Sequence, residues 1–168
     1  NGSEKFGPNN RFAFFPSFSL GWMISEEKFM KGLKFLDMLK LRGSWGRIGD
    51  DNVGGRWLYQ DSWGYQNSNT YLGLIPTATP YSYYRITSLG NENISWETVE
   101  KRNVGIDYSF FKGLIAGSVD IFSDKRKDIL VSGGSRSIPS FFGATAPTAN
   151  LGSTKSHGYE LELRLNYM

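Results

Sequence analysis

Polar and apolar residues alternate along several stretches of the chain, most clearly over Gly158–Met168, which reads GYELELRLNYM. Its odd positions hold Tyr, Leu, Leu, Leu and Tyr, and its even positions hold Gly, Glu, Glu, Arg and Asn. A period of two is typical of a β-strand with one apolar and one polar face. Such a strand fits a soluble sandwich, and it also fits a strand that crosses an outer membrane with aromatic residues at both interfaces.

Less regular alternation predicts four more strands before this one. Pro16 occupies an apolar-face position in the first of them and has no backbone N–H, so we expect a bulge or break there. The result is an all-β fold of about five antiparallel strands, each with one apolar and one polar face. We expect these strands near residues 11–22, 39–49, 96–111, 114–131 and 157–168.

One segment between the first two strands changes to a helical period. Ser25 is followed by two glutamates, which is typical of a helix N-terminus. Phe29, Leu33 and Leu36 then follow at helical spacing. We therefore expect one short helix within residues 25–38.

The connections between the predicted strands differ greatly in length. Segments 50–95 and 132–156 read as long loops, whereas the helix and a tight turn at Lys112-Gly113 make short connections. The long loops fall on one side of the predicted sheet and the short connections on the other, as in outer-membrane barrels. A loop as long as 50–95 is either functional or a sign of a wrong assignment.

Composition narrows the classes of function. The 168 residues suffice for one ordinary domain, contain no Cys, and carry a net charge of +3 with basic and acidic residues interspersed. These features argue against a disulfide framework and against a nucleic-acid partner. The mean hydropathy of −0.38 would suit a soluble protein, but a barrel wall escapes that test because only alternate residues meet lipid.

The N-terminus lacks a signal peptide, and we expect the sequence to be a piece of a longer protein.

The side chains offer little that could perform catalysis. His157 is the single histidine, and Glu160 and Glu162 lie two residues apart on one strand face, as expected of a wet wall. We therefore expect no catalytic residues, no metal site and no cofactor. We expect the basic residues of the polar faces to pair with acids along the wall, rather than to form a selectivity filter. These residues are Lys40, Arg42, Arg47 and Arg164, opposite Asp107, Asp120, Glu160 and Glu162.

The loop at 50–95 is rich in aromatic residues and is the one stretch with a hint of binding. Flat aromatic rings beside Asn, Asp and Gln suit sugar rings and also protein interfaces. The sequence predicts Trp57, Tyr59, Trp63 and Tyr65 as substrate contacts. There are two alternatives to substrate binding: these aromatic residues pack the loop on itself, or they contact a partner protein.

Four blocks of the sequence read, in order, FFPSFSLGWMISEEKF, LKLRGSWGRIGDDN, WETVEKRNVGIDYSFFKGLIAGSVDIFSDKRKDIL and HGYELELRLNY. Together they resemble the SusC/RagA family of TonB-linked outer-membrane transporters, and they occur in that family's order. The resemblance implies a large barrel, of about 22 strands, in the outer membrane of a Gram-negative cell. It implies a plug domain that these residues lack, a SusD-type surface lipoprotein as a lid, cargo of oligosaccharides or peptides, and TonB as the driver of import.

Three hypotheses follow from the sequence. The first is a barrel-wall segment of a TonB-dependent importer, in contact with outer-membrane lipid and without catalytic residues. The second is a soluble all-β carbohydrate-binding or adhesin module with the aromatic loop as its binding surface. The third, a glycosidase, has least support because no pair of carboxylates stands on separate elements with a reason for a shifted pKa.

Overall fold

The computed structural model describes residues 1–71, 80–139, 141 and 144–167 of the chain. These residues are mostly strand, with two 3₁₀ helices of three residues each, η1 (Ile24–Glu26) and η2 (Gly133–Ser135). The strands are β1 (Ser17–Met23), β2 (Leu36–Asp50), β3 (Ser62–Tyr71), β4 (Pro80–Ser88), β5 (Glu97–Phe110), β6 (Ile115–Val131) and β7 (Ala149–Leu165).

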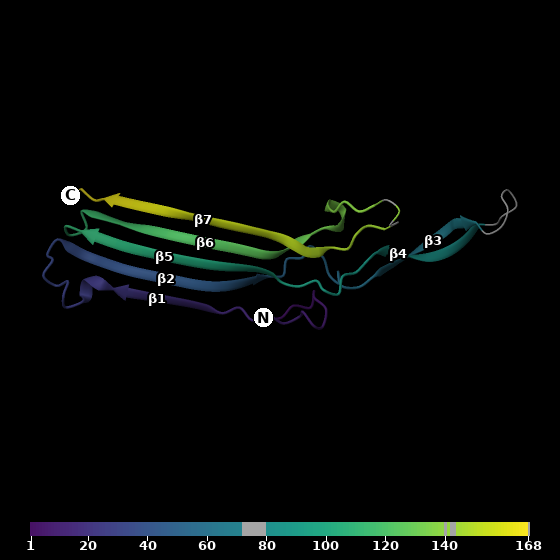
Figure 1. Cartoon of the computed structure of the whole chain (residues 1–168), viewed down its shortest axis with the longest axis horizontal. Helices are drawn as coiled ribbons and strands as arrows, with labels where there is room; N and C mark the ends of the chain where they lie inside the picture. Colours follow the sequence, from purple (N-terminus) through teal and green to yellow (C-terminus); the bar gives the residue numbers. More distant parts are fainter. Residues whose placement is uncertain (72–79, 140, 142–143, 168) are drawn as a thin grey trace. The chain divides into compact units, whose positions relative to one another are not determined.

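The strands form two separate sheets (Figure 1). Five of them make one sheet in the order β1-β2-β5-β6-β7, and β3 pairs with β4 in a two-stranded hairpin. The chain divides into two compact units. We call the first the sheet unit (Phe14–Asp50, Thr98–Lys127 and Ser153–Met168) and the second the loop unit (Asn1–Ala13, Asp51–Glu97 and Asp128–Gly152). The mostly antiparallel, five-stranded sheet confirms the predicted fold class.

The two faces of the sheet differ in chemistry, as the alternation predicted. Residues directly opposite each other in an antiparallel pair share a face, and Phe18 lies opposite Trp45 while Val104 lies opposite Ile121. On the other face Gly21 lies opposite Arg42. The four apolar-face side chains of β7 are all strongly exposed, from 59% to 82%: Tyr159, Leu161, Leu163 and Leu165.

Buried apolar residues lie almost entirely in the loop unit. Phe6, Val53, Ile94, Trp96 and Ala146 belong to it, whereas Val99 is the one buried apolar residue found among the described parts of the sheet unit. The five-stranded sheet therefore has no core of its own beneath either face. A soluble sandwich would cover the apolar face with a second sheet.

Aromatic residues bracket the apolar face of the sheet. Near one end Phe18 stacks on Trp45 with ring centroids 5.9 Å apart, and the Trp45 indole donates a hydrogen bond to Glu100 over 3.0 Å. At the other end Phe35 stacks on Phe110 at 6.3 Å. The eight residue steps from Tyr159 to Tyr167, of which the last two lie beyond the end of β7, cover about 27 Å in extended conformation. The apolar band of outer-membrane barrels is about 25 Å tall.

The polar face is held by charges that bridge three neighbouring strands. Arg42 of β2 donates through Nε to Asp107 Oδ1 of β5 over 3.1 Å and through Nη2 to Asp120 Oδ2 of β6 over 2.5 Å. The predicted pairing along the wall is thereby confirmed for Arg42. It is confirmed for Arg164 as well, which pairs with Glu162 of its own strand at 2.6 Å.

The predicted helix within 25–38 is wrong. The structure has the three-residue η1 followed by a series of turns, and β2 begins at Leu36. Each of these turns closes with an i to i+3 hydrogen bond, so the segment never forms the i to i+4 bonds of an α-helix. The apolar spacing that suggested a helix belongs to these turns.

Other boundaries also differ from the expected ones. β1 begins only at Ser17, directly after Pro16, which matches the expected break. The stretch 50–95 is not a plain loop, because it contains the β3–β4 hairpin. β7 begins at Ala149 rather than near 157, which shortens the second loop. The turn at Lys112-Gly113 spans four residues, since Phe110 pairs with Ile115.

Candidate functional site

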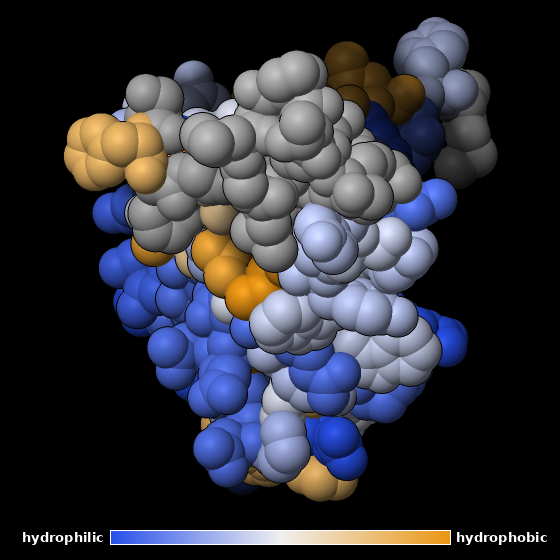
Figure 2. All heavy atoms as spheres, turned by 90° about the vertical axis from the view of Figure 1, so that its right-hand side faces the viewer, coloured by the Kyte–Doolittle hydropathy of each residue, from blue (hydrophilic) through white to orange (hydrophobic). Residues whose placement is uncertain are grey.

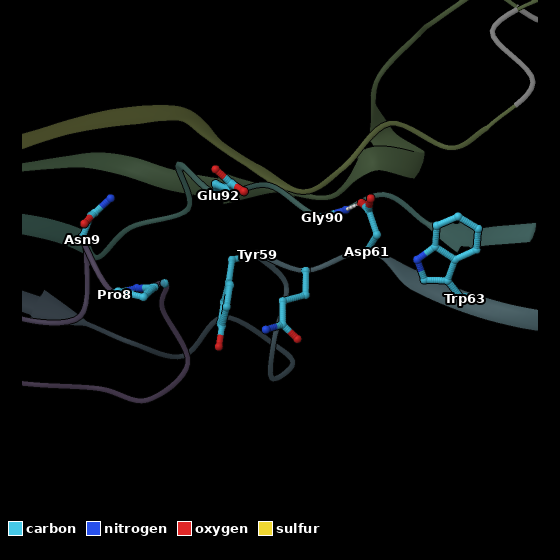
Figure 3. Close-up of a pocket in the computed structure, with 9 residues that line it drawn as sticks. Pro8, Asn9, Tyr59, Asp61, Trp63, Gly90 and Glu92 are labelled. Atoms are coloured by element: carbon cyan, nitrogen blue, oxygen red, sulfur yellow. Dashed lines mark hydrogen bonds between the residues drawn. The ribbon is translucent and has the colours of Figure 1, made fainter.

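A hollow of about 900 Å³ lies in the loop unit (Figure 3). Three segments that are far apart in the sequence build it: the N-terminal segment, the stretch that leads into β3, and the stretch that follows β4. The residues that line it are Gly7, Pro8, Asn9, Tyr59, Gln60, Asp61, Trp63, Gly90 and Glu92. Its walls thus combine two aromatic rings with amide and carboxylate groups.

Two hydrogen bonds hold the second and third segments together, one to a carboxylate and one between backbone groups. Gly90 N donates to Asp61 Oδ1 over 2.8 Å, and Asn91 N donates to Leu58 O over 2.9 Å. The approach is so close that a Cβ on Gly90 would lie 2.4 Å from the backbone carbon of Gln60. Only glycine allows these two backbones to meet at this distance.

The N-terminal segment is fixed to the third segment and to a small core. Asn10 Nδ2 donates to the carbonyl of Ile94 over 3.1 Å. Phe6 and Ile94 are fully buried, and the Phe6 ring lies 5.1 Å from that of Trp96. The hollow therefore stands on packed side chains, which hold its three segments in a defined geometry.

The structure brings two of the four predicted contact residues together. Tyr59 and Trp63 both line the hollow, on opposite sides of Asp61 in the view of Figure 3. Trp57 and Tyr65 are not among its lining residues. Trp57 adopts a positive φ of 56° in a turn that Gln60 N closes on its carbonyl, and its side chain is 59% exposed.

The hairpin extends the aromatic surface beyond the hollow. Trp63 lies opposite Ile86 and Tyr65 opposite Tyr84, so all four side chains share one face of the β3–β4 pair. The Tyr65 and Tyr84 rings are 5.3 Å apart, and both remain more than half exposed. Figure 2 looks onto the hairpin and loops, and most of the surface seen there is blue or pale rather than orange.

Several residues of this site were not predicted. Tyr84 and Ile86 alternate in β4 as Trp63 and Tyr65 do in β3, and that period of two was a signal that could have shown the hairpin. Asp61 and Glu92 give the hollow its acidic character. No local pattern marks these two carboxylates, because their proximity arises only from the fold.

The arrangement suits binding rather than catalysis. The aromatic faces of Tyr59 and Trp63 can stack on sugar rings or apolar side chains, and amide and carboxylate groups can accept or donate hydrogen bonds beside them. Asp61 and Glu92 are acidic, and none of the described lining residues is Lys or Arg. Within residues 1–71, 80–139, 141 and 144–167, no cluster of three or more His, Cys, Asp or Glu could hold a metal ion.

No helix in the described part of the chain is both long and apolar enough to span a membrane.

The five-stranded sheet defines the class of protein. Its one apolar and one charged face, the aromatic residues at both ends of the apolar face, and the absence of a covering layer among the described residues are the features of a barrel-wall segment. The chain belongs to the TonB-dependent receptor-like β-barrel family, since the model of that family matches residues 1–168. This is a family of outer-membrane proteins.

Comparison with individual proteins confirms the resemblance to SusC and RagA. The chain is 37% identical over 164 residues to the TonB-dependent receptor SusC of Bacteroides thetaiotaomicron, which is 97% of this chain and 16% of SusC. It is 35% identical over 166 residues to the TonB-dependent receptor P39 of Formosa agariphila, covering 14% of that protein. Among solved structures, the RagAB peptide importer in its closed-closed state matches with a TM-score of 0.78 and 26% identity over 99% of this chain. The chain thus spans about a sixth of the length of these relatives.

Proposed function

We propose that the chain is part of a TonB-dependent receptor that imports oligosaccharides or peptides across the outer membrane, together with a SusD-type surface lipoprotein. In this proposal the sheet unit forms part of the barrel wall, with lipid against its apolar face. The loop unit supplies extracellular loops. The TonB complex acts through segments of the receptor other than residues 1–168, and the chain performs no catalytic step.

The two-faced sheet is the observation that carries this proposal. Leu161 and Leu163 are 70% and 59% exposed on one face, while Arg42 binds Asp107 and Asp120 on the other. Exposing so much apolar surface to water would be costly, at about 25 cal/mol per Å². Lipid against the apolar face and a wet lumen against the charged face remove that cost.

The hollow of the loop unit is the proposed contact with cargo. Tyr59 and Trp63 offer stacking faces, and Asn9, Gln60 and Glu92 offer hydrogen-bonding groups around them. Both sugar rings and peptide side chains fit this chemistry, in line with a relative that is a peptide importer. Trp57 and Tyr65 remain proposed contacts because 59% and 56% of their surfaces are exposed.

The test uses the complete receptor that contains this chain, purified with its lipoprotein. A panel of neutral oligosaccharides and short peptides is first screened by calorimetry, and the best ligand is then measured with Trp63→Ala and Tyr59→Ala. Loss of an aromatic anchor should weaken binding by about 2 kcal/mol, or roughly thirtyfold. Uptake by energised cells should fall in the same variants.

Tyr83→Ala is the matched control, because Tyr83 lies opposite Gln66 on the other face of the hairpin. This variant should bind and import like the unaltered receptor. If Trp63→Ala and Tyr59→Ala both bind cargo as tightly as Tyr83→Ala does, the hollow is not the cargo contact. If the receptor imports no ligand when TonB is energised, the proposed transport function itself is wrong.

A further inference from the structure

The connection between β1 and β2 is a chain of turns that repeats every three residues. Each turn closes with a backbone hydrogen bond of 2.9 to 3.1 Å. The residue whose N–H closes one turn also offers its carbonyl as the acceptor of the next turn. The bonds are Glu27 N to Ile24 O, Met30 N to Glu27 O, Leu33 N to Met30 O and Leu36 N to Leu33 O. A residue that recurs every third position therefore recurs at the same place in each turn.

Lysine recurs in this way. Lys28, Lys31 and Lys34 are each the second residue of their turn, and all three are exposed. Lys112 joins them from the β5–β6 turn, because its neighbour Phe111 donates its N–H to the carbonyl of Phe35, next to Lys34, over 2.9 Å. No salt bridge of these four lysines is found within the described residues. We call the four side chains the lysine rim.

The nearby carboxylates are mostly engaged elsewhere. Glu27 Oε1 accepts a hydrogen bond from the Trp22 indole over 2.9 Å, and Asp37 Oδ2 accepts one from Gly113 N over 3.0 Å. Glu26 is exposed and is the remaining acid of this segment. The four lysines outnumber Glu26, Glu27 and Asp37, so the rim and these three carboxylates together keep a net charge of +1.

Exposed aromatic residues lie next to these lysines. Phe29 is 69% exposed, Phe35 46% and Phe111 56%. Phe35 stacks on Phe110 and packs in a tilted arrangement against Phe111, with ring centroids 6.3 Å apart in each pair. Since Phe110 lies opposite Ile115 at the end of β5, the aromatic residues continue the edge of the sheet at its turn end.

We propose that the lysine rim binds the phosphate groups of anionic phospholipids in the leaflet at the turn end of the sheet. The aromatic rings of Phe29, Phe35 and Phe111 enter the boundary between head groups and acyl chains. The lysine stems lie along this apolar surface, and their ammonium groups reach the phosphates. Charge complementarity and continuity with the apolar face favour a lipid surface over a soluble partner. The inference rests on the sheet lying in a membrane, and it holds whatever the receptor imports.

Native mass spectrometry of the complete receptor in detergent tests this inference. The receptor is titrated with phosphatidylglycerol and, in parallel, with phosphatidylcholine of the same acyl chains, and the affinity for each lipid is measured. The triple variant Lys28→Gln, Lys31→Gln, Lys34→Gln should bind phosphatidylglycerol at least tenfold more weakly. The expectation is about fivefold for each lysine near an anionic surface. Binding of phosphatidylcholine should not change. The triple variant Lys28→Arg, Lys31→Arg, Lys34→Arg keeps the positive charges and should retain the affinity for phosphatidylglycerol.

Lys40→Gln is the matched control, because Lys40 lies opposite Met23 near the same end of the sheet but on the polar face. It should bind phosphatidylglycerol like the unaltered receptor. If the triple glutamine variant does not fold, the single variants Lys34→Gln and Lys112→Gln serve instead, with about fivefold weakening expected for each. The inference is overturned if the glutamine variants keep their affinity, if phosphatidylcholine binds as tightly as phosphatidylglycerol, or if Lys40→Gln weakens binding equally.

Discussion

Gly105 lies beneath the Arg42 side chain, and an alanine there is expected to break the charge cluster on the polar face. A Cβ at position 105 would lie 2.5 Å from Asp120 Oδ1 and 2.8 Å from Arg42 Cζ. Non-bonded heavy atoms prefer separations of about 3.5 to 4.0 Å, so something must move. An arginine side chain is flexible, but Asp107 holds its Nε and Asp120 its Nη2. The guanidinium can make room only by leaving at least one carboxylate.

The expected cost follows from the burial of the three groups. Breaking a buried ion pair costs about 3 to 5 kcal/mol, and breaking an exposed pair about 0 to 1 kcal/mol. The side chains of Asp120, Asp107 and Arg42 are 11%, 24% and 35% exposed, so this cluster falls between the two cases. We take about 2 kcal/mol for the loss. Replacing glycine by alanine in a strand stabilises the fold by about 0.5 kcal/mol, because alanine loses less backbone entropy on folding. The net destabilisation is therefore about 1.5 kcal/mol.

Urea unfolding of the complete receptor in detergent micelles measures this difference. Gly43→Ala makes the same change on the apolar face of β2, where the nearest atom to an added Cβ is the Asn103 carbonyl at 4.0 Å. It should cost little. In an Arg42→Met background Gly105→Ala should lose the part of its effect that comes from displacing the guanidinium, whereas the close approach of the new Cβ to Asp120 Oδ1 remains. Equal destabilisation with and without Arg42 would refute the reasoning.

Two further predictions concern the apolar face and the hollow. Leu163→Arg places a charge in the lipid-facing band and should reduce the free energy of folding into vesicles by about 2 to 4 kcal/mol. Glu160→Arg, on the polar face of β7, should change this free energy little. Similar losses of folding free energy in the two variants would contradict the assignment of the faces. Gly90→Ala should weaken cargo binding at least as much as the loss of an aromatic ring, since its Cβ would lie 2.4 Å from the Gln60 backbone. Gly134→Ala, whose Cβ would have no atom within 4 Å, should bind cargo normally and serves as the control.

The sheet was predictable because its signal is local. In β7, Leu161, Leu163 and Leu165 each have a polar neighbour on both sides, and this pattern alone assigns the two faces. The pairing of Arg42 with Asp107 and Asp120 also followed, because charges on one wet face find each other across neighbouring strands. The sequence analysis also predicted ion pairs for Lys40 and Arg47, but neither residue forms a salt bridge within the described part of the chain.

The helix prediction failed because two periods resemble each other over a short segment. Phe29, Leu33 and Leu36 are spaced by four and three residues, which suits a helix, yet the hydrogen bonds recur every three residues. Isolated helices of this length are marginal in water. The bond from Phe111 N to Phe35 O ties the end of the segment to the next turn, and strand pairing prevails over the weak helical preference.

The hollow was only half predictable. Tyr59 and Trp63 stood out as aromatic residues in a polar loop, but nothing near them in the sequence indicates that Pro8 or Glu92 would join them. Their meeting depends on close contacts such as that between Gly90 and Gln60, which join distant parts of the chain. Composition can mark a loop as a candidate for binding, whereas the shape of the hollow can be known only from the fold.

A sheet without a core needs another way to fix its strands, and side chains laid across glycines of the neighbouring strand provide one. Arg42 of β2 lies over Gly105 of β5, and Phe122 of β6 lies over Gly158 of β7, where an added Cβ would be 2.9 Å from its ring. On the apolar face Tyr108 of β5 lies over Gly117 of β6.

These contacts link every pair of neighbours from β2 to β7 in the order β2-β5-β6-β7. Tyr108 reaches one strand further, because its hydroxyl donates to the carbonyl of Glu162 in β7 over 3.4 Å. Each glycine removes the Cβ that would otherwise lift the covering side chain away from the sheet. Cross-strand packing of this kind contributes about 0.2 to 1 kcal/mol per pair, and in a wall with lipid on one face and water on the other it stands in for the missing core.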